Sequence, residues 1–312
     1  MPILRLNAGP EGLSLHGSPA PALPALHRAA RGTGPVMILI HGFKYDPDRR
    51  PCSPHRTIFG REAHPARATH GSWLRHLGFG TGLRDEGLAL AFGWSARGNL
   101  WRAERSARAA GQHLAQVIRD MRTLNPDRPV HAITHSMGSE VIFEALHALR
   151  PGDISRIVTL TAATYASRAI AAMQTPAGRA AELFNITSRE NDVFDFMYER
   201  LIAPPARGDR AMGKGLDLPN AVNVQLDCLQ TLDTLPRFGG HVAPPGRRVC
   251  HWSGYTRPGA LRFYARALRD PDAVPLPALR TALPEASAPR WSRMFAPPQG
   301  APSLPLGQKA AS

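Results

Sequence analysis

Short apolar runs alternate with helix-patterned segments along most of the chain, and this order limits the folds open to it. The runs VMILI at 36–40 and LALAF at 88–92 are continuous, without a polar residue at every second position. Such continuity is typical of strands that are covered on both faces, as in a parallel sheet. Between residues 102 and 124 the apolar side chains instead recur at helical spacing, and Pro126 ends that pattern.

The alternation continues through the second half of the chain. Further strand-like and helical segments lie at 130–134, 138–149, 157–163, 167–173, 183–187 and 222–226. We therefore predict an α/β fold, with a mostly parallel, doubly wound sheet and helices on both faces. Because ligand sites in such sheets lie at the carboxyl ends of the strands, the residues after each strand are the first candidates for function.

Three regions are expected along the chain. Residues 1–34 are predicted to form an N-terminal hairpin followed by a Pro-rich connection. Residues 35–270 form the main domain, with a surface excursion at 44–86 that is rich in Gly, Pro and His. Residues 271–312 hold nine prolines, a composition typical of an extended tail.

The chain is strongly basic, with 38 Lys and Arg against 24 Asp and Glu and a net charge of +14. Such a balance is compatible with nucleic acid or an anionic membrane as a partner. The basic residues are spread along the whole chain, however, and no dense basic tract or nucleic-acid motif is visible. An Arg-rich, Lys-poor composition is also typical of a GC-rich genome, and this explanation is favoured because nucleic-acid motifs are missing, so no nucleic-acid partner is expected.

Targeting and metal signals are weak. No apolar run approaches the roughly 18 residues of a membrane-spanning helix, so no integral membrane insertion is expected. Three widely spaced cysteines and a start without a secretory pattern predict reduced thiols and a cytoplasmic protein. The excursion carries histidines whose spacing of nine and six residues matches no compact metal motif, so we expect no metal there; they are His55, His64, His70 and His76.

The segment VHAITHSMGSEVIFEAL places Ser136 between a buried strand and a helix. A serine on such a tight turn exposes its hydroxyl near backbone donors that are able to bind an oxyanion. Strand and helix pass close together there, which requires small residues on either side. Gly138 meets this requirement, whereas Thr134 departs from it. Taken alone, a serine after a strand is more often a simple helix cap.

THSMGS after a strand resembles the nucleophile elbow of the α/β-hydrolase superfamily, particularly its lipase- and esterase-like bacterial members. ILIHGF at 38–43 is similar to the superfamily's His-Gly turn, and LAFGWSARG at 90–98 is similar to the strand and aromatic-Ser turn between these motifs. The resemblance implies that the backbone N–H groups of Phe43 and Met137 form the oxyanion hole. His41 and His135 are expected to be structural, with His41 orienting the oxyanion loop and the His135 side chain turned away from the nucleophile.

A serine nucleophile needs a histidine base and a carboxylate that orients it, and the superfamily has them in the order Ser, acid, His. Asp192 follows the strand at 183–187 and is the predicted acid, with Glu190 and Asp195 as competitors. His251 is the predicted base because large side chains and a following helix anchor its loop. His241, in the Gly- and Pro-rich segment GGHVAPPG, is the alternative.

The predicted function is that of a serine hydrolase that cleaves a carboxylic ester through an acyl-enzyme on Ser136. Acyl transfer and thioester or amide hydrolysis would use the same residues, and a non-catalytic α/β-hydrolase-like binding protein is the alternative from another class. A small-molecule ester or acyl substrate is expected, without a cofactor. Substrate identity, acyl length and oligomeric state are left open.

Overall fold

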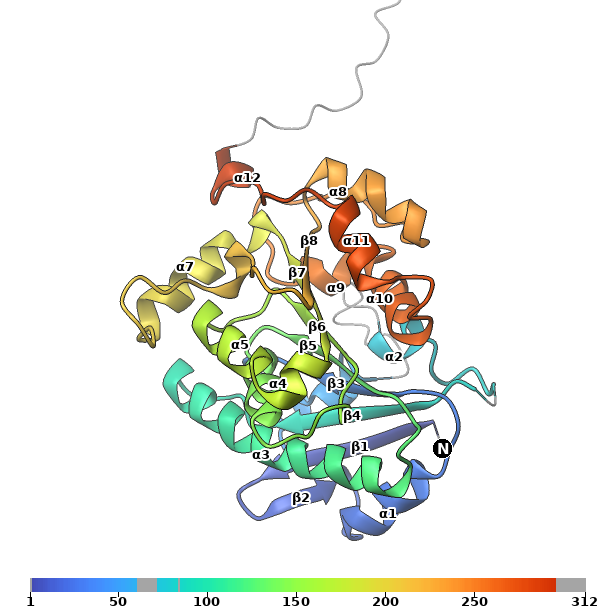
Figure 1. The fold of residues 1–312 in the computed structure, drawn as a ribbon. Coiled ribbons are helices and arrows are strands. Elements are labelled where there is room, and N and C mark those ends of the chain that lie inside the picture. Colours follow the sequence, from blue (N-terminus) through green and yellow to red (C-terminus); the bar gives the residue numbers. More distant parts are fainter. Residues whose placement is uncertain (1, 61–71, 84, 296–312) are drawn as a thin grey trace, which may run out of the picture.

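The computed structural model describes residues 2–60, 72–83 and 85–295, which form an eight-stranded sheet with helices on both faces (Figure 1). The strands are β1 (Ile3–Gly9), β2 (Gly12–Leu15), β3 (Val36–Ile40), β4 (Leu88–Trp94), β5 (Val130–His135), β6 (Arg156–Leu160), β7 (Glu182–Thr187) and β8 (Ala221–Gln225). Their order in the sheet is β2-β1-β4-β3-β5-β6-β7-β8. Among the strands of the described residues, β2 alone pairs antiparallel, which confirms the predicted α/β fold class.

Most of the connections between strands contain helices. These are α1 (Ala22–Ala30), α2 (Trp73–His76), α3 (Leu100–Leu124), α4 (Gly138–Leu146), α5 (Ala166–Met173), α6 (Pro176–Ala180), α7 (Asp192–Leu201), α8 (Leu229–Thr234), α9 (Ser253–Thr256), α10 (Ala260–Arg269), α11 (Leu276–Ala282) and α12 (Ser292–Phe295). The longest, α3, begins where the Asn99 side chain accepts the Arg102 N–H at 2.8 Å, and it ends before Pro126.

The two faces of the sheet belong to two separate hydrophobic clusters. Val36, Ile38 and Ile40 of β3 join the cluster that contains buried residues of α1, α3, α4 and α5. Met37 and Leu39 join the opposite cluster, with buried residues of α2, α10 and α11. Every residue of β3 is therefore buried, which explains its continuous apolar sequence.

The N-terminal segment is part of the sheet. β1 pairs in parallel with β4, and α1 packs Leu26 and Ala30 into the core beside it. The predicted Pro-rich connection thus contains a helix. Its prolines do not prevent this, because Pro21 precedes α1 and Pro24 lies in its first turn, where no intrahelical N–H bond is lost.

The first part of the predicted tail also differs from an extended segment. α11 buries Leu276 and Leu279 in the cluster that includes Val222 and Val224 of β8. Pro275 and Pro277 again precede the helix or lie in its first turn. Residues 296–312, like 61–71 and 84 of the predicted excursion, lie outside the described residues, so the division into three regions stays a prediction.

Candidate active site

Ser136 lies directly after β5 with a backbone φ of 54°, in the left-handed region that non-glycine residues rarely adopt. Its N–H donates to the Leu160 carbonyl at 3.0 Å, and α4 begins two residues later. This strained strand-to-helix turn is held by its surroundings, as is common at functional sites. The local geometry is that of the predicted elbow.

Close packing explains the small residues around this turn. A Cβ on Gly138 would lie 2.5 Å from the His41 carbonyl, and one on Gly42 would lie 2.7 Å from the Ser136 Cβ. Thr134 departs from the small-residue pattern but fits, because its Oγ1 lies 2.9 Å from the Ser139 hydroxyl. The buried threonine hydroxyl is therefore satisfied.

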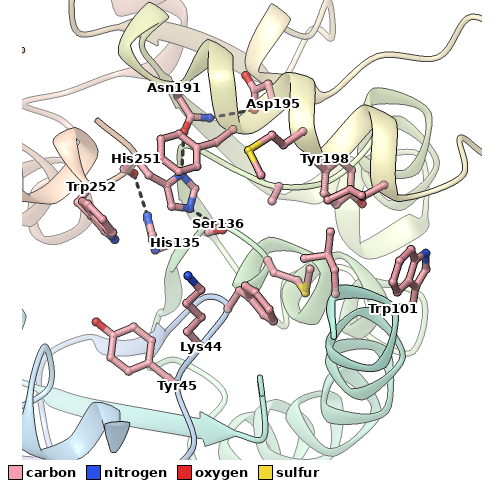
Figure 2. A pocket seen from close by; sticks show the side chains of 17 residues that line it. Lys44, Tyr45, Trp101, His135, Ser136, Asn191, Asp195, Tyr198, His251 and Trp252 are labelled. Carbon is pink, nitrogen blue, oxygen red and sulfur yellow. Dashed lines mark hydrogen bonds between the residues drawn. The ribbon is translucent and has the colours of Figure 1, made fainter. Parts of the chain in front are cut away.

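Among the histidines considered as base, His251 is the one that the structure brings to Ser136. Its Nε2 lies 2.9 Å from Ser136 Oγ (Figure 2), and the residue is half-buried. His241 instead lines a separate cavity with residues such as Leu232 and Phe263. His251 therefore occupies the place that a general base requires.

The loop that carries His251 is fixed through its backbone. The His251 carbonyl accepts hydrogen bonds from His135 Nε2 at 3.1 Å and from Thr161 Oγ1 at 3.0 Å. The N–H of Cys250 donates to the Glu190 carbonyl at 2.8 Å. The His135 ring centroid lies 4.7 Å from that of His251, so this side chain packs beside the histidine that contacts Ser136.

Asp192, the predicted acid, does not contact His251. Its carboxylate accepts from Arg189 at 3.1 Å and from the Trp291 N–H at 2.7 Å. The neighbouring Asn191 takes the expected place, with its Oδ1 2.7 Å from His251 Nδ1. Sequence reasoning missed Asn191, although an amide oxygen is an acceptor for an imidazole N–H just as a carboxylate is.

The two competing acids have different surroundings. Glu190 forms a buried ion pair with Arg257 and accepts from the Ser188 hydroxyl at 3.1 Å. Asp195, on α7, accepts from Asn191 Nδ2 at 2.9 Å. Ser136, His251, Asn191 and Asp195 thus form one continuous hydrogen-bonded row, drawn with dashed lines in Figure 2.

Phe43 and Met137, whose N–H groups are the predicted oxyanion donors, line the same cavity as Ser136. In the described part of the chain, neither the Phe43 nor the Met137 N–H donates a hydrogen bond. His41 holds the turn before Phe43, since its Nδ1 lies 2.9 Å from the Gly42 carbonyl and its Nε2 accepts the Trp94 N–H at 3.1 Å. Burial lowers the pKa of His41 to about 3, so the ring stays neutral.

Comparison with known families agrees with this geometry. The family described as alpha/beta hydrolase of unknown function (DUF900) matches residues 26–165, which include the His-Gly turn and Ser136. The chain has the α/β-hydrolase fold. The resemblance to this superfamily is confirmed at the level of the fold.

One solved structure with partial likeness is phospholipase PlaB from Legionella pneumophila in complex with thio-NAD, at 14% sequence identity and a TM-score of 0.29. The match covers 49% of this chain and 38% of the phospholipase chain. No curated protein matches the chain. Among the residues that the structure describes, no helix is long and apolar enough to cross a bilayer, and no three potential metal ligands cluster.

A cavity of about 760 Å³ opens beside Ser136 (Figure 2). Its walls are mostly apolar and come from the turn after β3, the start of α3 and from α7; they include Phe43, Leu100, Trp101, Phe194, Met197 and Leu201. Lys44, also in the left-handed region with φ 74°, directs its ammonium group into this space. Ser136 thus faces a mostly apolar cavity with Lys44 at its wall.

The pKa of His251 lies well below its usual range. Burial is the main cause, because it disfavours the charged imidazolium, and the nearby His135 and Lys44 act in the same direction. A neutral imidazole is the form that accepts a proton from serine. The electrostatics of this site therefore keep His251 in its basic form at neutral pH.

Proposed function

We propose that this α/β hydrolase is a serine hydrolase that cleaves carboxylic esters through an acyl-enzyme on Ser136. The observation that carries the proposal is the 2.9 Å contact between Ser136 Oγ and His251 Nε2, made by a serine on a strained strand-to-helix turn. A helix cap requires neither a histidine partner nor this backbone strain.

In the proposed reaction, Ser136 Oγ attacks the ester carbonyl carbon while His251 Nε2 takes the hydroxyl proton. The carbonyl oxygen becomes an oxyanion that the Phe43 and Met137 N–H groups bind. The C–O bond to the alcohol then breaks, and the alcohol leaves with the proton from His251. Water attacks the acyl-enzyme with the same base, which releases the acid and restores Ser136.

The substrate class follows from the chamber beside the serine. Its volume is in the range of small-molecule sites, and its walls are mainly apolar. An apolar acyl group would bury its surface there while its carbonyl carbon meets Ser136. Thioesterase, amidase or acyltransferase activity would use the same residues and differ in the leaving group or acceptor.

The test is hydrolysis of para-nitrophenyl esters from acetate to octanoate by the wild type and three alanine variants. Ser136→Ala and His251→Ala are expected to lose several orders of magnitude in kcat, because nucleophile and base act together. His241→Ala is the matched control and should keep its rate. Equal loss in the control, or turnover that survives Ser136→Ala, would contradict the proposal.

A further inference from the structure

The hydrogen-bonded row that starts at Ser136 extends beyond the residue that contacts His251. We propose that Asp195 is a positioning residue, which fixes the tautomer of His251 through the side-chain amide of Asn191. The inference rests on the proposed function, in which His251 is the base.

The hydrogen bonds of the Asn191 side chain have a defined direction. An amide side chain has a donor end and an acceptor end, and an ionised carboxylate only accepts. Asp195 at 2.9 Å therefore selects the Nδ2 end of Asn191, which turns Oδ1 toward His251. His251 must then carry its proton on Nδ1, which leaves the Nε2 lone pair for the Ser136 hydroxyl.

The Asn191 amide could take the opposite orientation if Asp195 were uncharged. A neutral carboxyl group at position 195 could donate its O–H to a flipped Asn191 amide. The amide nitrogen would then face His251 Nδ1, which would have to be unprotonated. The ring proton would move to Nε2 and point at Ser136, where no base would remain. Ionised Asp195 excludes this inactive arrangement.

The carboxylate is held in place by packing. Asp195 lies on α7, one turn after Asn191, and both side chains are buried. A Cβ on Gly213 would lie 2.1 Å from Asp195 Oδ2, although Gly213 is outside the left-handed region. Position 213 is therefore glycine because any side chain there would collide with the Asp195 carboxylate.

The pKa of Asp195 is set by influences that act in opposite directions. Burial is the main influence and raises its pKa to about 7; Asp192 and Glu199 act in the same direction, and Arg290 and Arg189 oppose them. Asp195 therefore gains its charge near neutral pH, where His251 is already neutral. We expect kcat to rise through about pH 7 as Asp195 ionises.

The test uses variants that keep the side-chain shape. Asp195→Asn removes the fixed direction and should lower kcat on the order of 100-fold with little change in KM, short of the ~10⁴-fold loss that a fully wrong tautomer causes. It should also abolish the rise near pH 7. The double variant Asn191→Asp/Asp195→Asn restores one direction, because a carboxylate then faces His251, and should recover most of the rate.

Asp192→Asn is the matched control, since this neighbouring carboxylate bonds to Arg189 and Trp291 and lies outside the row. It should keep the kcat that the wild type reaches above about pH 8, and the rise should move to lower pH, because the Asp192 charge helps to raise the pKa of Asp195. Gly213→Ala displaces the Asp195 carboxylate without removing it and should lower kcat in the same way. These two variants separate loss of the row from a general loss of buried charge.

NMR of the imidazole nitrogens reads the tautomer without any substrate. His251 should be protonated on Nδ1 in the wild type and in the double variant, and should be a mixture in Asp195→Asn. An unchanged tautomer and unchanged kcat in Asp195→Asn would overturn the proposal. If no ester is turned over but the tautomer shifts as expected, the positioning role stands and the proposed reaction fails.

Discussion

Asn191 and Asp192 are neighbours in the chain, yet only the Asn191 side chain contacts His251. Asn191 ends a short 3-10 turn (Arg189–Asn191), and Asp192 opens α7. Consecutive residues on a helical turn differ in direction by about 100°, so adjacent side chains reach different partners. Arg189 and the Trp291 N–H hold the Asp192 carboxylate away from the base.

Lys44→Met should raise the pKa of His251. The cation disfavours protonation of the nearby imidazole, so its removal leaves the imidazolium less unfavourable. NMR titration of the His251 ring should show the transition at higher pH than in the wild type. Arg237→Met, which removes an exposed cation outside the cavity, should leave the titration unchanged. A downward shift in Lys44→Met would contradict this account of the electrostatics.

Gly42→Ala should impair both folding and activity. The added Cβ would lie 2.7 Å from Ser136 Cβ and 2.8 Å from the His135 carbonyl, so the serine turn must shift. We expect a lower Tm. We also expect kcat to fall on the order of 100-fold, because displacing a reacting group by about 1 Å lowers the rate by about that factor. Gly246→Ala, with nothing within 4 Å of the added atom, serves as the control. Wild-type kinetics in Gly42→Ala would refute the close packing.

Glu190→Gln should destabilise the fold, since it leaves the buried Arg257 guanidinium without its ionic partner. Breaking a buried pair in this way costs roughly 3–5 kcal/mol. Urea unfolding measures the effect, and Asp217→Asn, in an exposed pair with Arg280, should change stability little. If Glu190 were the acid of the site, the folded variant would instead lose kcat at unchanged stability.

Stability should fall on acidification. Burial lowers the pKa of His41 to about 3, of His55 to about 2 and of His131 to about 3. Below pH 6.5, the approximate pKa of histidine in the unfolded chain, the unfolded state binds protons that these buried rings do not bind in the folded state. Each ring therefore lowers the free energy of unfolding by up to about 1.4 kcal/mol per pH unit. Asp195 opposes this, because its raised pKa favours the folded state as pH falls below about 7.

The measurement is the free energy of unfolding in urea between about pH 7 and pH 4. His131→Gln should make the fall in the free energy of unfolding less steep, by the contribution of one buried histidine. His147→Gln, at an exposed position, should leave the slope unchanged. A stability that is independent of pH over this range would show that the buried rings titrate in the folded protein as they do in the unfolded chain.

Much of the fold was predictable because a continuous run of apolar residues indicates a strand that is buried on both faces of the sheet. The runs at 36–40 and 88–92 became β3 and β4 for that reason. The errors came from proline: α1 and α11 both begin beside prolines that composition alone assigns to extended chain. Proline in a first turn is compatible with a helix, and only the apolar spacing of Leu26 with Ala30 or Leu276 with Leu279 indicates it.

The site was predictable where the backbone itself defines the geometry. The strand-to-helix turn at Ser136 and the loop before the helix that follows His251 are local features with sequence signals. The partner of His251 has no such local signal. Which side chain among Asn191, Asp192 and Asp195 reaches the imidazole depends on how the helical turn is rotated about its axis. Tertiary contacts set that rotation, for example the hydrogen bond from the N–H of Trp291, which lies far along the chain.

Labelling with a fluorophosphonate, followed by mass spectrometry of the peptides, shows whether Ser136 is an activated nucleophile. The probe reacts with an activated serine and needs no knowledge of the natural substrate. The account predicts a single adduct on Ser136, absent from Ser136→Ala and much slower to form in His251→Ala. An adduct on another residue, or a folded wild-type protein that does not react, would contradict it.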